Sequence, residues 1–400
     1  MSKNSHFTGQ PIFSQLLFLL PQDEINRTAR EFNSDAYCKK FRTYNHLITM
    51  LYCIFNRCTS LREVTSGLLA SEQKILHLGV DYQPRRSTLA DANARRDSAV
   101  FEAIYMKLLS KIRSFSPDSR SGKASQLYIV DSTTIKLFSS VLTNAGRKPA
   151  NGKRKGGIKV HTLISSAEDV PSLIQFTAAS ANDGPFLKEI QLPSGSIIVF
   201  DKGYLSYNEW NRFNDQDVTW ITRLNKSAVY EVREQKTLTE EQIEQGIKKD
   251  WIITLGHNHY KGKPKVEGRL VEYYDSAKDE LFQFITNSTL HDPFTICEFY
   301  RKRWQIELLF KRFKQNYPLH HFLGDSSNAI KIQIWCALIC DLILKYIKSK
   351  VKKKWAFSNL ASFIRIHLMT YIELFSFLKN PEKSLMKPYK EYNLPSLFAT

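Results

Sequence analysis

The chain has 400 residues, 42% of them hydrophobic and 24% charged, which is enough apolar material for the cores of two or three domains. Lysine and arginine outnumber aspartate and glutamate by 57 to 39, so the formal net charge is +18. This composition excludes a disordered or fibrous chain and favours a polyanionic partner, nucleic acid above all.

The hydrophobic pattern argues against a membrane partner. The longest apolar run, IQIWCALICDLILKYI from Ile332, contains Asp341 and is too short to span a bilayer. The early run IFSQLLFLLP lacks a small-residue cleavage site, so we expect no signal peptide. The six cysteines form no CxxC pair, which gives no indication of zinc and fits a reducing compartment. We therefore expect a cytoplasmic protein.

The first hundred residues predict helices. Apolar residues recur at helical spacing over 22–32, 36–56, 60–70 and 88–113, with polar breaks between these segments. Ser87 or Thr88 is the expected N-cap of the last helix. Four arginines around that helix form a candidate DNA-binding patch. A solvent-exposed helix face without a binding role explains them nearly as well. The patch consists of Arg85, Arg86, Arg95 and Arg96.

After a polar segment at 116–126, the period of the pattern changes to that of strands. Short β-branched and aromatic runs cover 127–138, 158–166, 172–180, 196–201 and 218–224. Short helical patterns, DGPFLKEIQ and SYNEWNRFND, lie between the later strands. Adjacent strands followed by strands that alternate with helices predict a mixed central sheet with helices packed against it.

Residues 226–290 interrupt this rhythm with further strand patterns and polar connections, as expected for a β-rich insertion. A long helix is expected from about Pro293 to Gln315, and an apolar, buried helix over 328–350. A basic run and another helical segment then close the patterned part of the chain.

Two aspartates lie within or directly after apolar strand patterns. Asp131 interrupts YIVDSTTI and Asp201 follows IIVF, where a carboxylate costs desolvation free energy unless a positive group compensates it. A single aspartate in such a place most often ends a turn or pairs with a lysine. Two of them in a basic chain, with a glutamate inside a basic helix, indicate a shared site.

That glutamate is Glu307, the one acid among six basic residues in FYRKRWQIELLFKRFKQ. On an α-helix Glu307 shares an arc of about 60° with Tyr300, Arg303 and Lys314. An adjacent apolar face can hold the helix against the sheet, with Glu307 directed toward the strand carboxylates. The alternative is an exposed helix in which Glu307 forms i,i+4 salt bridges with Arg303 and Lys311.

Three converging carboxylates are the ligands that hard divalent cations prefer. We therefore predict that Asp131, Asp201 and Glu307 bind Mg²⁺, with Mn²⁺ as an alternative. Two such ions can activate a water or a 3′-hydroxyl and stabilise the leaving oxygen of an in-line displacement at phosphorus. Arg303 and Lys314 are predicted to contact phosphates beside the reacting one.

Four other residues are weaker candidates. Asp183 is more often a turn or helix N-cap residue than a metal ligand, and His161 is more often structural than a general base. Lys159 can contact phosphate, although a solvated lysine is the default. Trp304 can stack on a flipped base, but packing in the core is the more common role.

The segment YRKRWQIELLFKRFK contains the spacing Y-(2)-R-(3)-E-(6)-K and thereby resembles the DDE transposases of insertion sequences, of the IS-four-like type. DKGY at 201–204 resembles the D-x-G-Y around that family's second acid, and VDSTTIKL resembles the strand of its first acid. GIKVHTL and FLGDSSNAIKIQIWCALI are further similarities, so the resemblance covers most of the chain to about residue 380.

The resemblance implies an α/β fold with an RNase H-like catalytic core and a β-rich insertion, preceded by a helical N-terminal domain and followed by helices. We expect a DNA-binding domain over 1–115 and a catalytic domain over 125–345, with its insertion at about 226–290. A basic helical segment is expected over 346–400.

The resemblance also implies an activity: cleavage of the ends of an insertion sequence and their joining to target DNA by two-metal phosphoryl transfer. It implies a catalytic triad of Asp131, Asp201 and Glu307. It implies double-stranded DNA as the partner, a homodimer when synapsed, and a nucleoid-associated location. The residues expected to position DNA strands are Tyr300, Arg303 and Lys314.

Two other functions fit the same residues. The first is a metal-dependent nuclease on the same fold, which cuts DNA without joining it. The second is a DNA-binding protein descended from a transposase that no longer catalyses a reaction. Three acids in the expected order argue against the second reading.

Overall fold

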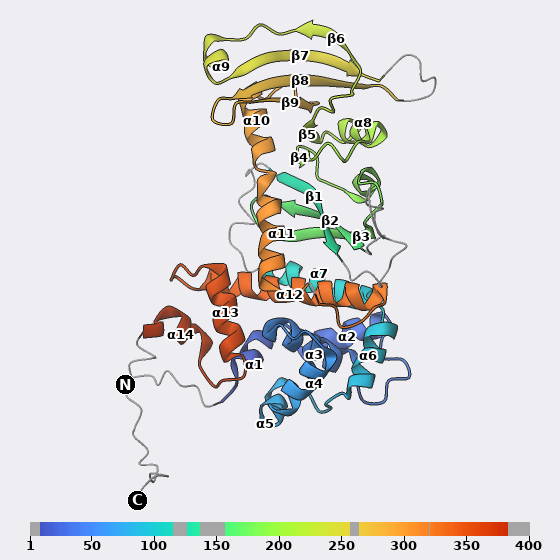
Figure 1. The fold of residues 1–400 in the computed structure, drawn as a ribbon, viewed down its shortest axis with the longest axis vertical. Helices are drawn as coiled ribbons and strands as arrows, with labels where there is room; N and C mark the ends of the chain where they lie inside the picture. The colour runs from blue at the N-terminus through green and yellow to red at the C-terminus, as the bar shows by residue number, and fades with distance from the viewer. Residues whose placement is uncertain (1–8, 115–125, 137–156, 257–263, 320, 383–400) are drawn as a thin grey trace, which may run out of the picture. The chain divides into compact units, whose positions relative to one another are not determined.

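The computed structural model describes residues 9–114, 126–136, 157–256, 264–319 and 321–382 (Figure 1). The chain divides into two compact units. The helical unit combines the N-terminal helices with the C-terminal ones, and the sheet unit comprises 113–315 with the short segment 325–327.

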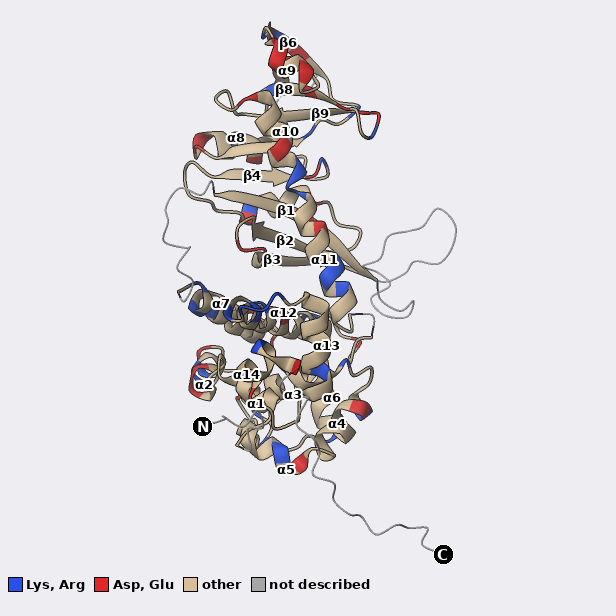
Figure 2. Cartoon of the chain, turned by 90° about the vertical axis from the view of Figure 1, so that its left-hand side faces the viewer, with Lys and Arg blue, Asp and Glu red and all other residues tan. Residues whose placement is uncertain are grey.

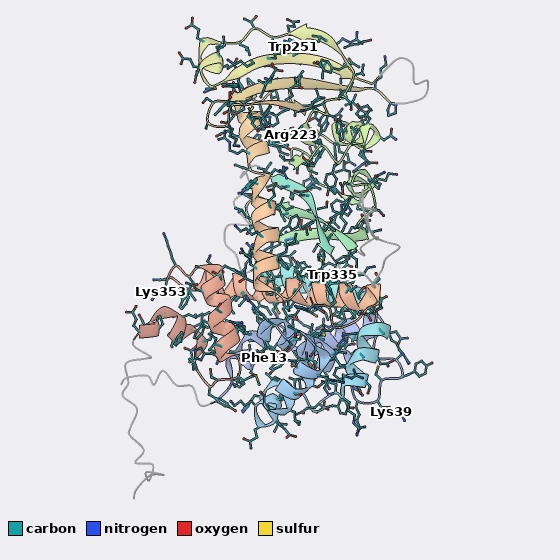
Figure 3. All side chains as sticks on the ribbon, viewed as in Figure 1. Phe13, Lys39, Arg223, Trp251, Trp335 and Lys353 are labelled. Carbon is teal, nitrogen blue, oxygen red and sulfur yellow. The ribbon has the colours of Figure 1, made fainter. Side chains whose placement is uncertain are left out.

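The helical unit is built around two buried helices, α3 and α12. Both are apolar on nearly all sides, and Trp335 in α12 is 2% exposed; Figure 3 labels it together with Phe13, another core residue of this unit. None of the described helices, α12 included, is long and apolar enough to cross a membrane. The elements are α1 (Ile12–Leu17), α2 (Gln22–Glu31), α3 (Thr43–Asn56), α4 (Leu61–Leu69), α5 (Glu72–Ile75), η1 (Leu76–Leu78), α6 (Arg86–Arg95), α7 (Ala99–Ser114), α12 (Ser327–Lys350), α13 (Phe357–His367) and α14 (Leu374–Lys379).

The helix predicted from residue 36 begins only at Thr43. Tyr37 has a left-handed φ of 60°, which is incompatible with an α-helix at this position. The side chain of Asp35 accepts a hydrogen bond from the Thr43 backbone N–H at 2.6 Å. Residues 36–42 are therefore a loop, and Asp35 directly before it satisfies one of the free N–H groups at the start of α3.

The helix predicted over 88–113 is two helices, α6 and α7. Arg96 between them has an extended backbone, and its buried guanidinium donates to the carbonyl of Phe41 at 2.9 Å. Arg96 therefore does not belong to an exposed basic patch, whereas Arg85, Arg86 and Arg95 are exposed. The N-cap of α6 is Arg85, so the predicted cap at Ser87 or Thr88 is wrong.

The sheet unit contains, within the described residues, one sheet of nine strands in the order β3-β2-β1-β4-β5-β9-β8-β7-β6 (Figure 1). β1 runs parallel to β4 and β4 parallel to β5, while the other neighbours are antiparallel. The mixed α/β fold is thus confirmed, and the strands predicted at 226–290 extend the same sheet through β9. The strands are β1 (Leu127–Lys136), β2 (Gly157–Ser165), β3 (Pro171–Ala178), β4 (Ile197–Phe200), β5 (Thr219–Arg223), β6 (Tyr230–Gln235), β7 (Ile247–Leu255), β8 (Val266–Asp275) and β9 (Glu280–Thr286).

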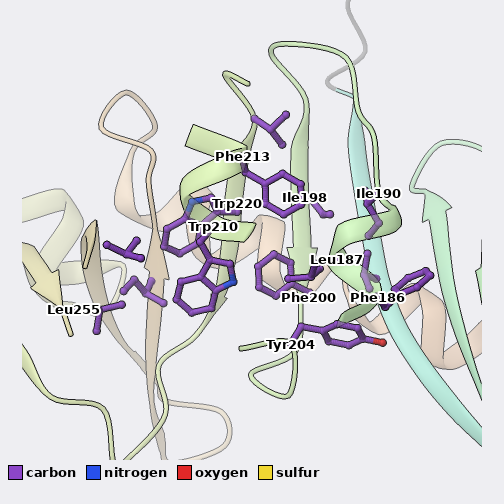
Figure 4. Packing of buried hydrophobic residues seen from close by; sticks show 14 of the residues in the cluster. Phe186, Leu187, Ile190, Ile198, Phe200, Tyr204, Trp210, Phe213, Trp220 and Leu255 are labelled. Atoms are coloured by element: carbon purple, nitrogen blue, oxygen red, sulfur yellow. The ribbon is translucent and has the colours of Figure 1, made fainter. Parts of the chain in front are cut away.

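Both faces of the sheet centre are buried. Along β4, Ile198 and Phe200 belong to one apolar cluster, and Ile197 and Val199 belong to another, as the two-residue period of a strand requires. Figure 4 shows the first cluster, to which η4 (Gly184–Glu189) and α8 (Tyr207–Asp215) contribute. Helix α10 (Pro293–Arg301) contributes to the second. A further short helix, α9 (Glu240–Glu244), precedes β7.

The long helix predicted from Pro293 to Gln315 is interrupted. It consists of α10 and α11 (Trp304–Asn316), joined by Lys302 and Arg303. Across the joint, the backbone N–H groups of Arg303, Gln305 and Ile306 each donate to the carbonyl three residues earlier. The joint is therefore a tighter turn of the 3₁₀ type, which changes the direction of side chains on either side of it.

Candidate active site

The two strand aspartates are neighbours. β1 and β4 are parallel with Val130 opposite Phe200, and Asp131 and Asp201 directly follow these two residues. Neighbouring strands are about 5 Å apart, so the backbones of the two aspartates lie close together. Val130 and Phe200 face the cluster shown in Figure 4, and alternation directs the side chains that follow them toward the other face, where α10 packs. The register thus brings together the two aspartates that the sequence analysis assigned to one site.

Glu307 is connected to Asp131 through Arg303. The guanidinium of Arg303 donates from Nη1 to Asp131 Oδ2 at 2.8 Å and from Nη2 to Glu307 Oε1 at 2.6 Å. Glu307 therefore does form the i,i+4 salt bridge of the alternative reading, but that bridge is shared with the strand acid. Ile306 and Leu309 on the same helix are buried, as predicted for the face that holds α11 in place.

The electrostatics of this cluster follow from its partial burial. Burial raises the pKa of Asp131 to about 6, a rise that the hydrogen bond from the Ser132 backbone N–H and the charge of Arg303 oppose. Burial disfavours the charge of Arg303, but Tyr300, Asp131 and Glu307 outweigh it and raise the pKa of the guanidinium. The cluster is thus a negative site with one fixed positive group inside it.

Tyr300 and Lys314 stand at different distances from the acids. The hydroxyl of Tyr300 is 3.5 Å from Asp201 Oδ1, and burial raises the pKa of this phenol to about 12, so it remains a neutral donor. Lys314 is exposed on α11, nearly two helical turns beyond Glu307. Figure 2 shows the acid of α11 in red, followed by basic residues in blue toward the end of the helix.

The donor chemistry of the site fits a hard divalent cation, since all three acids supply carboxylate oxygens. Among the described residues, however, no group of three or more Asp, Glu, His or Cys side chains lies close enough together to hold a metal ion. The guanidinium of Arg303 lies between Asp131 and Glu307 and neutralises them. Metal binding by all three acids therefore requires Arg303 to release at least one of them.

A pocket of about 350 Å³ opens beside Tyr300 and Arg303. The guanidinium of Arg223, labelled in Figure 3, lies 4.7 Å from the ring centre of Phe282 in its wall. Trp304, also in the wall, is 59% exposed, so its predicted packing in the core is wrong. Basic and aromatic side chains thus lie together next to the acids.

A second polar network lies beside the acids, and the sequence analysis did not identify it. Lys159 is 2% exposed rather than solvated, and its Nζ donates to Asp183 Oδ1 at 2.8 Å. Asp183 is the N-cap residue of η4, as predicted, but its side chain makes no capping hydrogen bond to that helix. It accepts a hydrogen bond from Ser132 Oγ at 3.3 Å instead.

His161 is structural, as the sequence analysis favoured. Its Nδ1 lies 3.2 Å from the hydroxyl of Tyr204, and its Nε2 lies 2.8 Å from Thr177 Oγ1. Burial lowers the pKa of the imidazole to about 4; the charge of Lys159 adds to this effect and that of Asp183 opposes it. A polar triplet of alternate strand residues, Lys159 and His161 on one strand with Ser132 on the next, was the signal that could have revealed the network.

Comparison with known proteins places the chain among transposases. The family model "Transposase DDE domain" matches residues 122–342, and "Domain of unknown function (DUF4372)" matches residues 8–81. "Putative transposase y4zB" from Sinorhizobium fredii is 30% identical over 266 residues, which are 66% of this chain and 71% of that protein. "Putative transposase for insertion sequence element IS4SA" from Synechocystis is 27% identical over 65% of this chain and 71% of its own.

A third relative, "Probable transposase for insertion sequence element IS5377" from Geobacillus stearothermophilus, is 25% identical over 60% of this chain and 61% of its own length. Among solved structures, the piggyBac transposase synaptic complex with hairpin DNA matches with a TM-score of 0.44 and 11% identity, over 98% of this chain and 86% of that one. A likeness that weak carries no argument, so the assignment depends on the family model and the relatives. The chain belongs to the transposase DDE family, a class of metal-dependent enzymes that cleave DNA and transfer its strands.

Proposed function

We propose that Asp131, Asp201 and Glu307 are the catalytic triad of this DDE transposase and hold its divalent metal ions. The observation that carries the proposal is the register of β1 and β4, which makes Asp131 and Asp201 neighbours on adjacent parallel strands. The salt bridges of Arg303 to Asp131 and Glu307 support the inclusion of the third acid.

Mg²⁺ is the proposed ion, and Mn²⁺ the proposed substitute, because carboxylates are the donors that both prefer. When bound, the ions would activate the attacking hydroxyl and stabilise the leaving oxygen at phosphorus. Before they bind, Arg303 reduces the repulsion between Asp131 and Glu307. If Asp131 or Glu307 held a metal ion instead, the guanidinium of Arg303 would be free to bind a phosphate of the DNA.

Tyr300, Arg303 and Lys314 are proposed to position the DNA strands. Tyr300 and Arg303 line the pocket beside the acids, and Lys314 is exposed farther along α11. A neutral phenol, a planar guanidinium and an ammonium offer donors of three shapes to a phosphate backbone.

Several finer assignments follow from the same reading. The sheet order β3-β2-β1-β4-β5, with β2 antiparallel to its neighbours, supports an RNase H-like core. We assign the chain to the IS-four-like type because of its Y-R-E-K spacing. We further propose that residues 1–115 bind the element's ends, that the synapsed protein is a homodimer, and that it associates with the nucleoid through DNA.

In vitro cleavage and strand transfer test this function. Labelled DNA from the ends of the surrounding element is incubated with wild type or Glu307→Gln, with Mg²⁺ or with EDTA. We expect metal-dependent cleavage and joining by wild type and a loss of at least about a thousandfold in the variant, since metal ions supply several kcal/mol of transition-state stabilisation. Cleavage without joining would indicate a nuclease, and DNA binding that is indifferent to metal and to the substitution would indicate a DNA-binding relic. Light scattering of the protein with and without this DNA tests the dimer.

A further inference from the structure

The network around Asp183 reaches β1 on the face opposite Asp131. Side chains alternate along β1, so Ser132 points to the face opposite Asp131. Ser132 is paired with His161 on β2, and Lys159 is two residues from His161 on the same face. The network therefore contacts the backbone that carries Asp131 from behind.

Lys159 needs Asp183. A lysine side chain that is 2% exposed must be paired and hydrogen-bonded to be tolerated, and its Nζ donates to Asp183 Oδ1 at 2.8 Å and to the carbonyl of Ala181 at 2.6 Å. These two bonds fix the position of the Asp183 carboxylate on the segment between β3 and η4.

Asp183 in turn is linked to the first acid. Its Oδ1 accepts a hydrogen bond from Ser132 Oγ at 3.3 Å, and the backbone N–H of Ser132 donates to Asp131 Oδ1 at 2.7 Å. A displacement of Asp183 would therefore reach Asp131 through one intervening residue.

Asp183 also borders the turn that carries the second acid. A Cβ atom on Gly203 would be 3.1 Å from Asp183 Oδ2 and 3.8 Å from Asp201 Oδ2, so the turn lies closely against both carboxylates and leaves little space for a side chain. The backbone N–H of Tyr204 closes this turn onto the carbonyl of Asp201 at 3.0 Å. The hydroxyl of Tyr204 is in turn held by His161.

We propose that Asp183, held by Lys159, is a positioning residue that fixes Asp131 and Asp201 relative to each other for metal binding. The inference depends on the proposed function, in which those two acids are metal ligands. Asp183 itself is not proposed as a ligand, because its Oδ1 already accepts hydrogen bonds from Lys159 and Ser132.

The test compares Asp183→Asn with a matched control, Asp250→Asn, in the full-length protein. Asp250 is paired with Arg269 in a buried ion pair of the same sheet, with side chains 5% and 4% exposed, so both variants leave a buried cation without its acid. β7, which carries Asp250, is five strands from β1 in the sheet order, about 24 Å away. Asp131→Asn serves as the reference for the proposed function.

Three quantities are measured: Mn²⁺ binding by electron paramagnetic resonance without DNA, the Mn²⁺ concentration that gives half-maximal cleavage of element-end DNA, and the melting temperature. We expect Asp183→Asn to weaken Mn²⁺ binding and raise the half-maximal concentration by about 10- to 100-fold, with most of the cleavage restored at saturating Mn²⁺. Asp250→Asn should lower the melting temperature and leave both Mn²⁺ quantities unchanged.

The other outcomes are decisive as well. If Asp183→Asn lowers only the melting temperature, the ion pair is structural and the proposal is wrong. If it abolishes cleavage at every Mn²⁺ concentration while folded, Asp183 is itself a ligand and the positioning role is wrong. If Asp131→Asn retains metal-dependent cleavage, the proposed function fails instead. Should Asp183→Asn not fold, Ser132→Ala removes the hydrogen bond from Ser132 Oγ to Asp183, and an unchanged Mn²⁺ requirement in that variant overturns the proposal.

Discussion

Two arginines of the sheet unit hold carboxylates in different ways. Arg269 is 4% exposed, and its Nε and Nη2 donate to the two oxygens of Asp250 at 2.6 and 2.7 Å, while its Nη1 donates to the carbonyls of Ser288 and His291. Arg303 is 16% exposed and divides its Nη atoms between two acids from different elements, and its buried Nε has no hydrogen-bond partner among the described residues. In the first arrangement all three guanidinium nitrogens donate and the pair is closed, whereas in the second Nε donates to no described residue and the acids are open to exchange.

This difference separates a structural ion pair from one that can be rearranged. A buried bidentate pair gains nothing by opening, because a new partner of Arg269 must replace two charge-assisted hydrogen bonds to Asp250. A guanidinium shared by two acids loses one charge-assisted bond when one acid turns to a metal ion, and a DNA phosphate can replace that bond. Substitutions of Arg269, Arg303 and Glu231 test this distinction, and the pH dependence of His161 tests the network beside the acids.

The largest effect on stability is expected for the closed pair. Arg269→Met leaves Asp250 buried without a counter-charge, which should lower the free energy of unfolding by about 3–5 kcal/mol. Urea unfolding followed by tryptophan fluorescence measures this loss. In the double variant Arg269→Met with Asp250→Leu, most of the loss should be recovered; a double variant as unstable as the single one would contradict the reading of a purely structural pair.

A smaller effect on stability, but a clear functional one, is expected for the shared arginine. Arg303→Gln removes two charge-assisted hydrogen bonds, each of which is worth about 1.5–3 kcal/mol in general and less at a partly exposed site. Because the guanidinium no longer competes for Asp131 and Glu307, Mn²⁺ should bind the DNA-free variant more tightly than wild type. Cleavage should nevertheless fall by about a hundredfold, since the proposed contact of Arg303 with a phosphate would be lost. Calorimetry and cleavage assays measure the two effects, and weaker Mn²⁺ binding by the variant would show that Arg303 does not compete with metal.

The pH dependence of stability tests the polar network behind the acids. Burial lowers the pKa of His161 to about 4, so the folded protein holds this imidazole neutral while the unfolded chain protonates it near pH 6.5. The stability contributed by His161 is therefore complete above pH 6.5 and is lost as the pH falls toward 4, by about 2 kcal/mol at pH 5. The charged and titratable groups that face the ring are Lys159, Asp183 and Tyr204.

Urea unfolding of wild type and His161→Gln at pH 7 and pH 5 measures this contribution. His46 in the helical unit has a pKa lowered in the same direction by burial, so the difference between wild type and variant is the relevant quantity. If the free energy of unfolding changed equally between pH 7 and pH 5 in the two proteins, His161 would be protonated in the folded state at pH 5, and its pKa would not be lowered.

The sequence predicted the parts of the site that depend on local pattern. Two aspartates in or directly after apolar strand patterns, with a glutamate in a basic helix, were sufficient to predict a shared site, whereas the parallel register that makes Asp131 and Asp201 neighbours was not predicted. The joint between α10 and α11 was not predictable, since the segment contains no glycine or proline there. The side chain of Arg303 bridges two acids at that joint, one of them 172 residues earlier in the chain.

The burial of charged side chains was not predictable from the sequence either. A lysine within a strand reads as exposed, and the partner of Lys159 lies 24 residues away on a segment that reaches it only after β3 has paired with β2. Arg96 was read as part of a basic patch for the same reason, because its acceptor, the Phe41 carbonyl, lies 55 residues earlier. The sequence pattern predicts whether a segment is a helix or a strand. It does not identify which charged side chains pair with residues distant in the chain.

The smallest effect is expected for an exposed pair in the same sheet. Arg233 and Glu231 on β6 form a salt bridge of 3.0 Å, with side chains 56% and 51% exposed. Water and salt screen such a pair, and fixing two long side chains costs entropy, so Glu231→Gln should change the free energy of unfolding by less than about 0.5 kcal/mol. Urea unfolding at low and high salt measures this change beside that of Arg269→Met. If the exposed pair proved as costly to break as the buried one, burial would not be what distinguishes the arginines of this sheet, and the contrast between Arg269 and Arg303 would need another cause.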